Sequence, residues 1–524
     1  SNETSQEGVM SNRQVHEDRH DRIRRYYNSG TFHSSPVAFM AYTLLADQLR
    51  HETVGDLLWL ACIGVTDAFI HNRLDLSGYV KLAMDLQGKI EKVYPDLSAE
   101  DRFRERMANT MYAEDLYGGA GSSTSDEYNG PMTQVTFSDN GRVLSQRDEF
   151  RFFLLRHTSL WDAMILSPDL NTKMELWRSS GIRNLQEMLA KMGLPLSQCQ
   201  QPYAFMKPNL KRRLKFMMIE HEEEYGLENL KYTAFVRVTG YKSLLSASDM
   251  SLAVTALLEC DSYQSENATN HSQESAFPAL SEEEEEEHSL LSSFNVAYDA
   301  LNSNAASSSV FGSLSEVGGV GGTEGTDLST IVNGGDMASN NGLGSGIRLA
   351  ISVQRSIITT AVNLVERKAI NRLSHFRYAY LHATSHGANG GKKGQGIGSS
   401  DGSSRDAQKN QHHIFAKPLA LTKLAHFLMD MHRSNNKWTG TRALPLVLLA
   451  EKPQSHTYLV IGFEYPEMKG SVKNNKFGKK FELAAKTIDG IHFKFDSFDS
   501  HVVEIGSDDV SRFIEQLHYM IDSI

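Results

Sequence analysis

Cysteine is scarce in this sequence, and long apolar runs are missing. The chain has only three cysteines, Cys62, Cys199 and Cys260, and none of them forms a CxxC pair. This pattern excludes a disulfide framework and a thiolate zinc site, and it is typical of a reducing compartment. No apolar run approaches the length of about 20 residues that a membrane span needs, and the first residues lack a signal-peptide core. We therefore expect a soluble protein of the nucleus or cytosol.

An excess of positive charge is missing as well. The formal net charge is −11, which argues against a protein that coats nucleic acid through bulk positive charge. A local basic groove is still compatible with this charge. With 524 residues, of which 40% are hydrophobic, the chain is long enough for two or three domains with separate cores.

Four stretches lack the apolar residues that would offset the entropy of ordering them. They are residues 1–21, 115–131, 261–346 and 386–410. The third holds the run Glu282 to Glu287, which we interpret as a solvated linker or as an acidic contact for a basic partner. An apolar island within it, Leu290 to Leu301, favours a helix. The chain begins at Ser1 without a methionine, and we expect a fragment or a processed start.

Helical periodicity dominates the middle of the chain. Apolar residues at positions 185, 188, 189 and 192 follow the i, i+3, i+4, i+7 spacing, and Gly193 stands at the expected C-cap. A second amphipathic helix is predicted around Leu214, and a third after Ser248 or Asp249 as its N-cap. The middle is therefore predicted to be helical.

The C-terminal part alternates strands with helices, which predicts a small α/β domain. Two apolar runs, at residues 444–450 and 457–463, predict a pair of strands joined by a turn. The other predicted elements are helices around 358–365, 421–431, 477–486 and 513–521, and strands at 492–495 and 501–505.

Motifs that carry chemistry are weak in this sequence. The run Gly390 to Gly396 lacks the GxxxxGK[ST] order of a phosphate loop, and we interpret it as a flexible loop. His412 and His413 are adjacent, so their rings point apart and a paired metal site is not expected. Asp56 is predicted to cap an apolar helix, and Asp67 follows that helix either as a cap or as a metal ligand.

Several blocks of sequence occur in the order of one known family. The block from Asp56 to Asp67 (DLLWLACIGVTD) resembles the family's D-LW-A-VG-TD segment, and the block from Arg156 to Asp162 (RHTSLWD) resembles its HWSLHD segment. Residues 185–196 (LQEMLAKMGLPL) are the most specific match. From about residue 22 to the end, outside the polar stretches, the chain resembles the cell division control protein 45 family of eukaryotic replication factors.

That resemblance implies a RecJ-like α/β architecture with long disordered inserts. The implied domains are the remainder of a DHH-type phosphoesterase domain (1–145, with 1–21 and 115–131 flexible), a helical insert that binds partners (146–260), an acidic and Ser/Gly-rich disordered insert (261–346), and a DHHA1-type α/β domain (347–524, with 386–410 flexible). The family's N-terminal part has no counterpart here, so half of the DHH-type domain is expected to be missing.

The resemblance also bears on catalysis. Active relatives bind divalent metals, usually manganese, through a DHH triplet and other residues, including an Asp at the position of Asp67. This sequence has no DHH triplet, and a lone carboxylate cannot hold two cations at a phosphate. Where active relatives carry GGHxxAAG, this chain has Lys479 and Lys480 at the glycine positions and Phe481 at the histidine position. We therefore expect no cofactor and no catalysis.

The function that the resemblance implies is that of a structural subunit of the replicative helicase, in the nucleus. Its partners would be the minichromosome maintenance ring, the GINS complex and replication-loading factors, with no membrane contact. It would act at origins and travel with the fork. The predicted partner-binding segment includes Trp161, Trp177, Leu185, Met188 and Met192. For the two tryptophans, packing in the core is the alternative.

Two other functions compete with this interpretation. A metal-dependent exonuclease or phosphoesterase of the DHH class would release nucleotides with manganese and would depend on Asp67. A passive binder of single-stranded DNA would use Lys479 and Lys480 as charges and Phe481 as a stacking face. The alternative for Phe481 is that it packs inward, below a solvated helix N-terminus.

Overall fold

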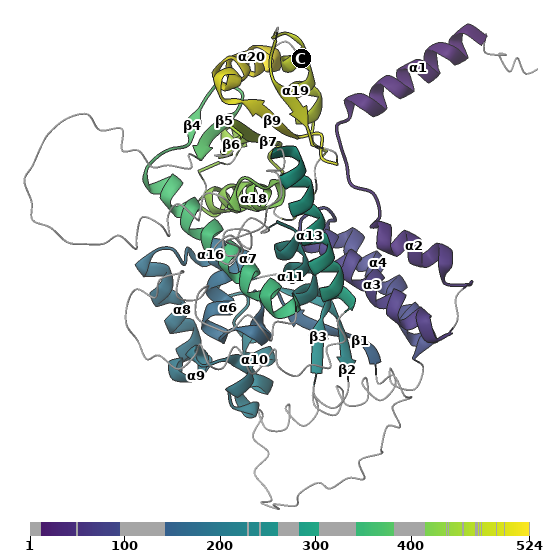
Figure 1. Ribbon diagram of the computed structural model, residues 1–524. Helices are drawn as coiled ribbons and strands as arrows, with labels where there is room; N and C mark the ends of the chain where they lie inside the picture. The colour runs from purple at the N-terminus through teal and green to yellow at the C-terminus, as the bar shows by residue number, and fades with distance from the viewer. Residues whose placement is uncertain are drawn as a thin grey trace, which may run out of the picture. The chain divides into compact units, whose positions relative to one another are not determined.

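The chain divides into two compact units in the computed structural model (Figure 1). The described residues are 12–48, 51–94, 142–227, 230–239, 243–259, 282–302, 342–381 and 414–522, apart from a few positions in the last range. Unit 1 comprises Ser1–Ser34, Gly325–Asn333 and Arg355–Ile524, and unit 2 comprises Ser35–Glu324 and Gly334–Gln354. Within the described part, no helix is both long and apolar enough to cross a membrane. The predicted loop 390–396 and the His412-His413 pair lie outside the described residues.

Unit 2 is mostly helical, with one small sheet. Its α-helices are α2 (Val37–Leu45), α3 (His51–Ile70), α4 (Leu76–Val93), α6 (Leu160–Leu166), α7 (Pro168–Met174), α8 (Ser179–Lys191), α9 (Leu196–Gln200), α10 (Pro208–Glu220), α11 (Ala247–Glu259), α13 (Glu282–Asn302) and the first part of α16 (Gly342–Glu366). Its strands are β1 (Arg142–Phe150), β2 (Lys231–Thr239) and β3 (Ser243–Ser246), and two short 3-10 helices are η1 (Leu155–His157) and η2 (Tyr203–Phe205).

The three strands of unit 2 form an antiparallel sheet in the order β1-β2-β3. β1 and β2 pair along their whole length, from Arg142 opposite Thr239 to Phe150 opposite Lys231. The prediction that 146–260 is a helical insert is therefore wrong for these strands. Helical periodicity dominates the sequence between β1 and β2. The pairing of the two strands joins distant residues, so the local sequence does not reveal it.

Between β1 and β2, helices α6 to α10 enclose a core of their own. Leucines and methionines dominate it, and Leu185, Met188 and Met192 are all fully buried there. Because methionine is flexible, it fills the irregular gaps between short helices. α8 ends as predicted, with Gly193 just beyond it at φ +66°, a conformation that glycine adopts without strain.

Helix α3 packs on α2, α4 and α11, and it also contacts the sheet. It is apolar nearly all round, with Leu58, Trp59 and Val65 buried. The helix begins at His51, so Asp56 is not its cap; the Asp56 carboxylate pairs with Arg237 on β2 instead.

Helix α13 corrects the prediction that 261–346 is a disordered insert. The predicted apolar island at 290–301 is indeed helical, but the helix starts at Glu282 and includes the glutamate run. Glutamate is a good helix former, and negative charge is favourable at a helix N-terminus. The helix packs against Leu257 of α11 through the buried side chains of Ala297 and Ala300. The start of α16, from Gly342, also falls within the predicted insert.

Unit 1 is a mixed α/β unit. Its helices are α1 (Asn12–Asn28), the second part of α16, α18 (Pro418–Ser434), α19 (Phe477–Lys486) and α20 (Val510–Asp522), with two short 3-10 helices η4 (Gly440–Arg442) and η5 (Ser507–Asp509). Its strands are β4 (Asn371–Arg372), β5 (Arg377–Leu381), β6 (Leu446–Lys452), β7 (Thr457–Phe463), β8 (Phe493–Phe495) and β9 (Val502–Gly506).

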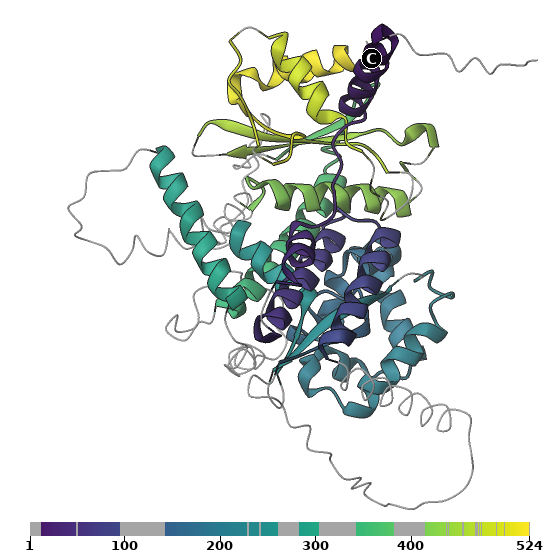
Figure 2. The same cartoon turned by 90° about the vertical axis from the view of Figure 1, so that its right-hand side faces the viewer.

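The six strands of unit 1 form one sheet in the order β4-β5-β6-β7-β9-β8. Only β5 and β6 are parallel; every other pair is antiparallel. Helices α19 and α20 cover one face and α18 covers the other (Figures 1 and 2). Because both faces are covered, all seven residues of β7 are buried, which explains its nearly continuous apolar sequence. The predicted strands and helices of this region are confirmed.

Helix α1 corrects the prediction that residues 1–21 are flexible, since residues 12–28 are helical. Its described side chains are almost all exposed, so packing does not explain the helix. Its sequence places Asp18 four residues before Arg22, and Asp21 four residues before Arg25. Opposite charges at this spacing stabilise a helix that has no buried face.

Two apolar stripes of unit 2 are exposed on neighbouring helices. Val37, Met40 and Leu44 follow an i, i+3, i+7 pattern on α2, and the exposed fractions of Val37 and Leu44 are both 75%. On α4, an i, i+4, i+8 stripe includes Met84, which is 65% exposed. Lys89 of α4 lies 4.5 Å from the ring centroid of Phe39 on α2, so the two helices are in contact.

Exposed stripes of this kind promote self-association in an isolated chain. We expect the double substitution Leu44→Gln and Met84→Gln to reduce self-association and binding of the dye ANS. Thermal unfolding should be unchanged, because both side chains are already in water. Light scattering and dye fluorescence measure the effect, with the exposed Lys81→Gln as the control. Equal self-association of the variant and the wild-type chain would contradict the expectation.

His432 of α18 is buried beside aromatic and cationic groups. It stacks on Trp438 with ring centroids 3.9 Å apart, and the guanidinium of Arg377 lies 4.4 Å from the same Trp438 ring. Among the described residues, neither ring nitrogen of His432 has a hydrogen-bond partner. Burial, together with the charges of Lys437 and Arg377, lowers the pKa of His432 to about 4.

This pKa predicts a loss of stability on acidification. The unfolded histidine takes up a proton near pH 6.5, whereas the folded one resists it down to about pH 4. The free energy of unfolding should therefore fall as pH drops through this window, by up to about 3 kcal/mol. His432→Phe keeps the stacked ring and should remove this part of the pH dependence. Urea unfolding between pH 7 and pH 4 measures it; the exposed His492→Gln should keep the wild-type slope, and an unchanged slope in His432→Phe would refute the assignment.

Candidate functional site

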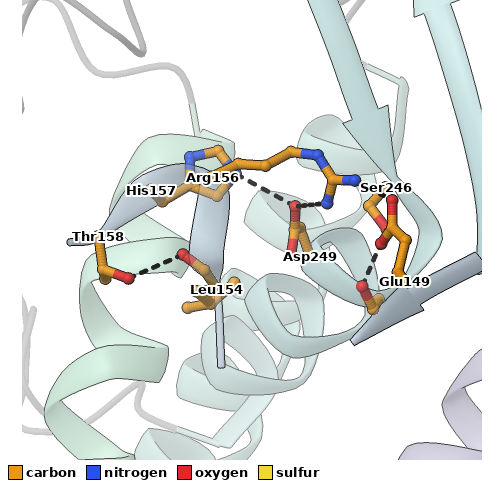
Figure 3. A network of polar contacts seen from close by, with 8 residues as sticks. Glu149, Leu154, Arg156, His157, Thr158, Ser246 and Asp249 are labelled. Carbon is orange, nitrogen blue, oxygen red and sulfur yellow. Dashed lines mark hydrogen bonds and ion pairs between the residues drawn. The ribbon is translucent and has the colours of Figure 1, made fainter. Parts of the chain in front are cut away.

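A network of charged side chains joins three elements of unit 2 (Figure 3). Arg156 of η1 donates from Nη1 to Oδ2 of Asp249 on α11, at 3.2 Å, and its Nη2 pairs with Glu149 of β1. His157 Nε2 lies 3.5 Å from the same Asp249 oxygen. Ser246 of β3 donates to Glu149 Oε2 at 3.4 Å. The network thus connects both edge strands of the sheet with the first turn of α11.

Local backbone geometry brings these residues together. β1 ends at Phe150, and Leu154 takes a left-handed conformation at φ +49°, which turns the chain into η1. On the other side α11 follows β3 directly, so Asp249 lies within the first turn of the helix. Asp249 is therefore inside α11 and is directed to the network; it is not an N-cap.

The electrostatics of the network keep Asp249 and Arg156 ionised. Burial alone would raise the pKa of Asp249, but the neighbouring His157 and the charge of Arg156 outweigh it and lower the pKa. Burial likewise opposes the charge of Arg156, yet Asp249 and Glu149 raise its pKa. A general acid or base needs a pKa near the working pH. Asp249 stays ionised beside the Arg156 guanidinium, so it does not suit that role. It instead connects α11 with η1.

Sequence reasoning did not find this network. Arg156 and His157 served only as part of a family motif, and Asp249 only as a candidate helix cap. A signal was present for Arg156 and His157, because they follow directly on the apolar run from Phe152 to Leu155. Charged residues in such surroundings are buried only when they are paired.

Asp67 lies within α3, which continues to Ile70, and not beyond the helix end. Its Oδ1 lies 3.2 Å from His71 Nε2 and accepts a hydrogen bond from Ser251 of α11 at 2.8 Å. Burial would raise the pKa of Asp67, but His71, Ser251 and Arg73 lower it to about 2. The Asp67 carboxylate thus connects α3 with α11 through its contacts with His71 and Ser251. Among the described residues, no group of three or more His, Cys, Asp or Glu is placed to hold a metal ion.

The predicted nucleic-acid contacts Lys479 and Lys480 lie in the first turn of α19, and both have protein partners. Lys480 forms an ion pair with Glu464 at 2.9 Å, and Lys479 donates a hydrogen bond to Asn28. Phe481 is fully buried in the core between the six-stranded sheet and helices α19 and α20. Phe481 therefore packs inward and offers no stacking face, which corrects that part of the single-strand hypothesis.

Residues just after α1 reach the same end of α19. Thr31 and Asn475 exchange two backbone hydrogen bonds, of 2.8 and 2.9 Å. Gly30 has φ +91°, and a Cβ at this position would lie only 2.6 Å from the carbonyl oxygen of Asn475. A glycine is needed here because the two backbones approach so closely. The contact of Lys479 with Asn28 belongs to this junction.

The predicted partner-binding segment is divided by the structure. Leu185, Met188 and Met192 are core residues of unit 2, so they are not available to a partner. Trp161 is half-buried and packs against the same core. Trp177 is also half-buried, between α7 and α8. The sequence pattern identified amphipathic helices correctly, but their apolar faces pack on one another.

With this geometry in place, comparisons with known proteins decide the family. The profile of the family described as CDC45 matches residues 1–520 of this chain. The chain belongs to the CDC45 family. The resemblance seen in the sequence blocks is thereby confirmed.

Curated members of the CDC45 family extend beyond the matched region. The cell division control protein 45 homolog of Dictyostelium discoideum is 25% identical over 491 residues, which cover 93% of this chain and 62% of that protein. Cell division control protein 45 of Saccharomyces cerevisiae is 26% identical over 512 residues, covering 94% and 63%. This chain thus spans less than two thirds of the length of these relatives.

A solved structure supports the fold. The crystal structure of CDC45 from Entamoeba histolytica aligns with a TM-score of 0.52 at 19% identity, and it covers 94% of this chain and 73% of that one. At this identity the likeness concerns the fold alone. The predicted α/β class is confirmed as a helix-rich α/β fold similar to that of CDC45.

The Arg156 network predicts a large effect on stability. Arg156→Met should lower the free energy of unfolding by about 3–5 kcal/mol, because it leaves Asp249 and Glu149 buried without their cation. Arg178→Met is the matched control: Arg178 is exposed and pairs with Glu175 in the turn between α7 and α8, so its loss should cost less than about 1 kcal/mol. Urea unfolding measures both. Similar small losses in the two variants would show that the network contributes little.

Proposed function

We propose that this chain is a non-catalytic replication factor that acts through its interfaces in the nucleus. The observation that carries the proposal is the match of the CDC45 family to residues 1–520. Relatives that bear the name cell division control protein 45 align with nearly the whole chain. Its partners would be the minichromosome maintenance ring, the GINS complex and replication-loading factors, at origins and at the moving fork.

The domain assignment belongs to the same proposal. Residues 1–145 would be the remainder of a DHH-type domain, and 347–524 a DHHA1-type domain. The six-stranded sheet with helices on both faces supports an independent C-terminal domain. The separate core of α6 to α10 supports an inserted module within 146–260.

The contacts of Asp67 favour this function over that of a DHH-class exonuclease. A metal ligand needs lone pairs that are free to face a cation. The Asp67 carboxylate instead binds His71, Ser251 and Arg73. Its geometry is that of a residue that connects two helices.

The proposal is tested by assembly. The purified chain should co-elute with recombinant GINS and with the minichromosome maintenance ring of the same organism in size-exclusion chromatography. Arg178→Met serves as a folded control, because it changes only an exposed pair. Failure of the folded chain to bind either partner would contradict the proposal.

A nuclease assay tests the competing function. With manganese and single-stranded DNA, the chain should release no nucleotides above the background of the Asp67→Asn variant. Asparagine keeps the shape of the side chain but removes the charge that a metal needs. Release by the wild-type chain that the variant lacks would establish an enzyme.

A further inference from the structure

A row of phenylalanine rings runs from the core of unit 1 to its surface. Phe477 lies 5.4 Å from Phe481, Phe481 lies 5.6 Å from Phe513, and Phe513 lies 5.9 Å from Phe493, measured between ring centroids. The last step, from Phe493 to Phe495, is 4.9 Å. Phe477 is fully buried, whereas Phe495 on the edge strand β8 is 41% exposed. The outer ring, Phe495, is therefore connected through the other rings to the packed core of unit 1.

The loop between β8 and β9, which follows Phe495, carries a further phenylalanine, Phe498. Phe498 is 95% exposed, more than any other large apolar side chain among the described residues. The Oδ2 atom of Asp496 accepts hydrogen bonds from the N–H groups of Phe498 and Asp499, both at 3.0 Å. Two backbone bonds close the loop, from Asp496 to Val502 at 3.1 Å and from Val502 to Asp499 at 2.9 Å. The backbone at Phe498 is thus held by hydrogen bonds, while its ring is exposed.

The charge around Phe498 indicates what it contacts. Asp496 and Asp499 flank the ring, and neither is paired with a cation within the described part of the chain. Lys494 does not offset them, because it faces Glu504 across the β8–β9 pair and alternates with Phe493 and Phe495. Two carboxylates repel the phosphates of nucleic acid and of anionic membranes. They attract a protein surface that carries Lys or Arg.

We propose that the β8–β9 loop is a docking element, and that Phe498 inserts into an apolar pocket of a partner protein whose rim is basic. A rigid aromatic side chain loses little entropy on binding, which makes it an effective anchor. Asp496 and Asp499 meet the cations of the rim and set the orientation. The choice of partners to test, GINS and the minichromosome maintenance ring, rests on the proposed function.

Affinity measurements with purified GINS and with the ring test the anchor. Phe498→Ala should weaken the binding of one of them at least tenfold, as expected for a hot-spot residue. Thermal unfolding should not change, since the ring is exposed in the folded chain. Phe205→Ala is the matched control: Phe205 is 63% exposed in unit 2, and its loss should leave the affinity unchanged. An equal loss in both variants would overturn the proposal.

A double substitution separates the effect of charge from that of shape. Asp496→Asn and Asp499→Asn together keep an oxygen that accepts the two loop hydrogen bonds but remove both charges. The affinity should fall, and its dependence on salt should become weaker. A photo-crosslinking phenylalanine at position 498 should label a partner peptide that contains apolar residues beside Lys or Arg. Labelling of DNA alone, or no labelling in the assembled complex, would refute the docking role.

The outcomes distinguish this inference from the proposed function. If the wild-type chain binds neither GINS nor the ring, the proposed function fails, and this choice of partner fails with it. If the wild-type chain and Phe498→Ala bind equally well, the docking inference alone fails. Loss of binding only in the Phe498 and Asp496/Asp499 variants supports both.

Discussion

A buried guanidinium that must be neutralised is the constraint on which unit 2 depends. Arg156 is held between Glu149 of β1 and Asp249 of α11, and His157 lies beside the same Asp249 oxygen. Removing Arg156 leaves the buried Asp249 and the largely buried Glu149 without the guanidinium that pairs with both carboxylates. The strand, the turn and the helix are therefore connected through one charged network.

The same use of charge recurs at Asp67. In active relatives an aspartate at this position serves a metal, as the family resemblance implies, whereas here it serves His71 and Ser251. A carboxylate with a pKa of about 2 that already accepts such bonds holds helices α3 and α11 together. The proposed role in assembly needs no metal at this carboxylate, because its partners lie within the chain. In unit 1, Lys480 likewise has a partner within the chain, because it forms an ion pair with Glu464.

Sequence reasoning succeeded where elements are local. The helix from Phe477 to Lys486 and the strand from Thr457 to Phe463 occur where the apolar pattern placed them. It failed for β1 and β2, because their pairing joins residues that are almost a hundred positions apart, Arg142 with Thr239. It also failed for α1, because charges four residues apart stabilise this helix and it has no apolar face that periodicity could reveal.

The sequence by itself determined the family, the α/β class, and which helices are amphipathic, because blocks of residue types and short-range periodicity survive without knowledge of contacts. Only the tertiary structure decided what each apolar or charged side chain faces. Met188 and Phe481 are core residues, whereas Phe498 is exposed. Periodicity gives the face of an element, but the identity of the neighbour on that face depends on how distant segments pack. The neighbouring group decides whether an apolar side chain is a core residue or an exposed anchor. It also decides whether a carboxylate can bind a metal or is already part of an ion pair.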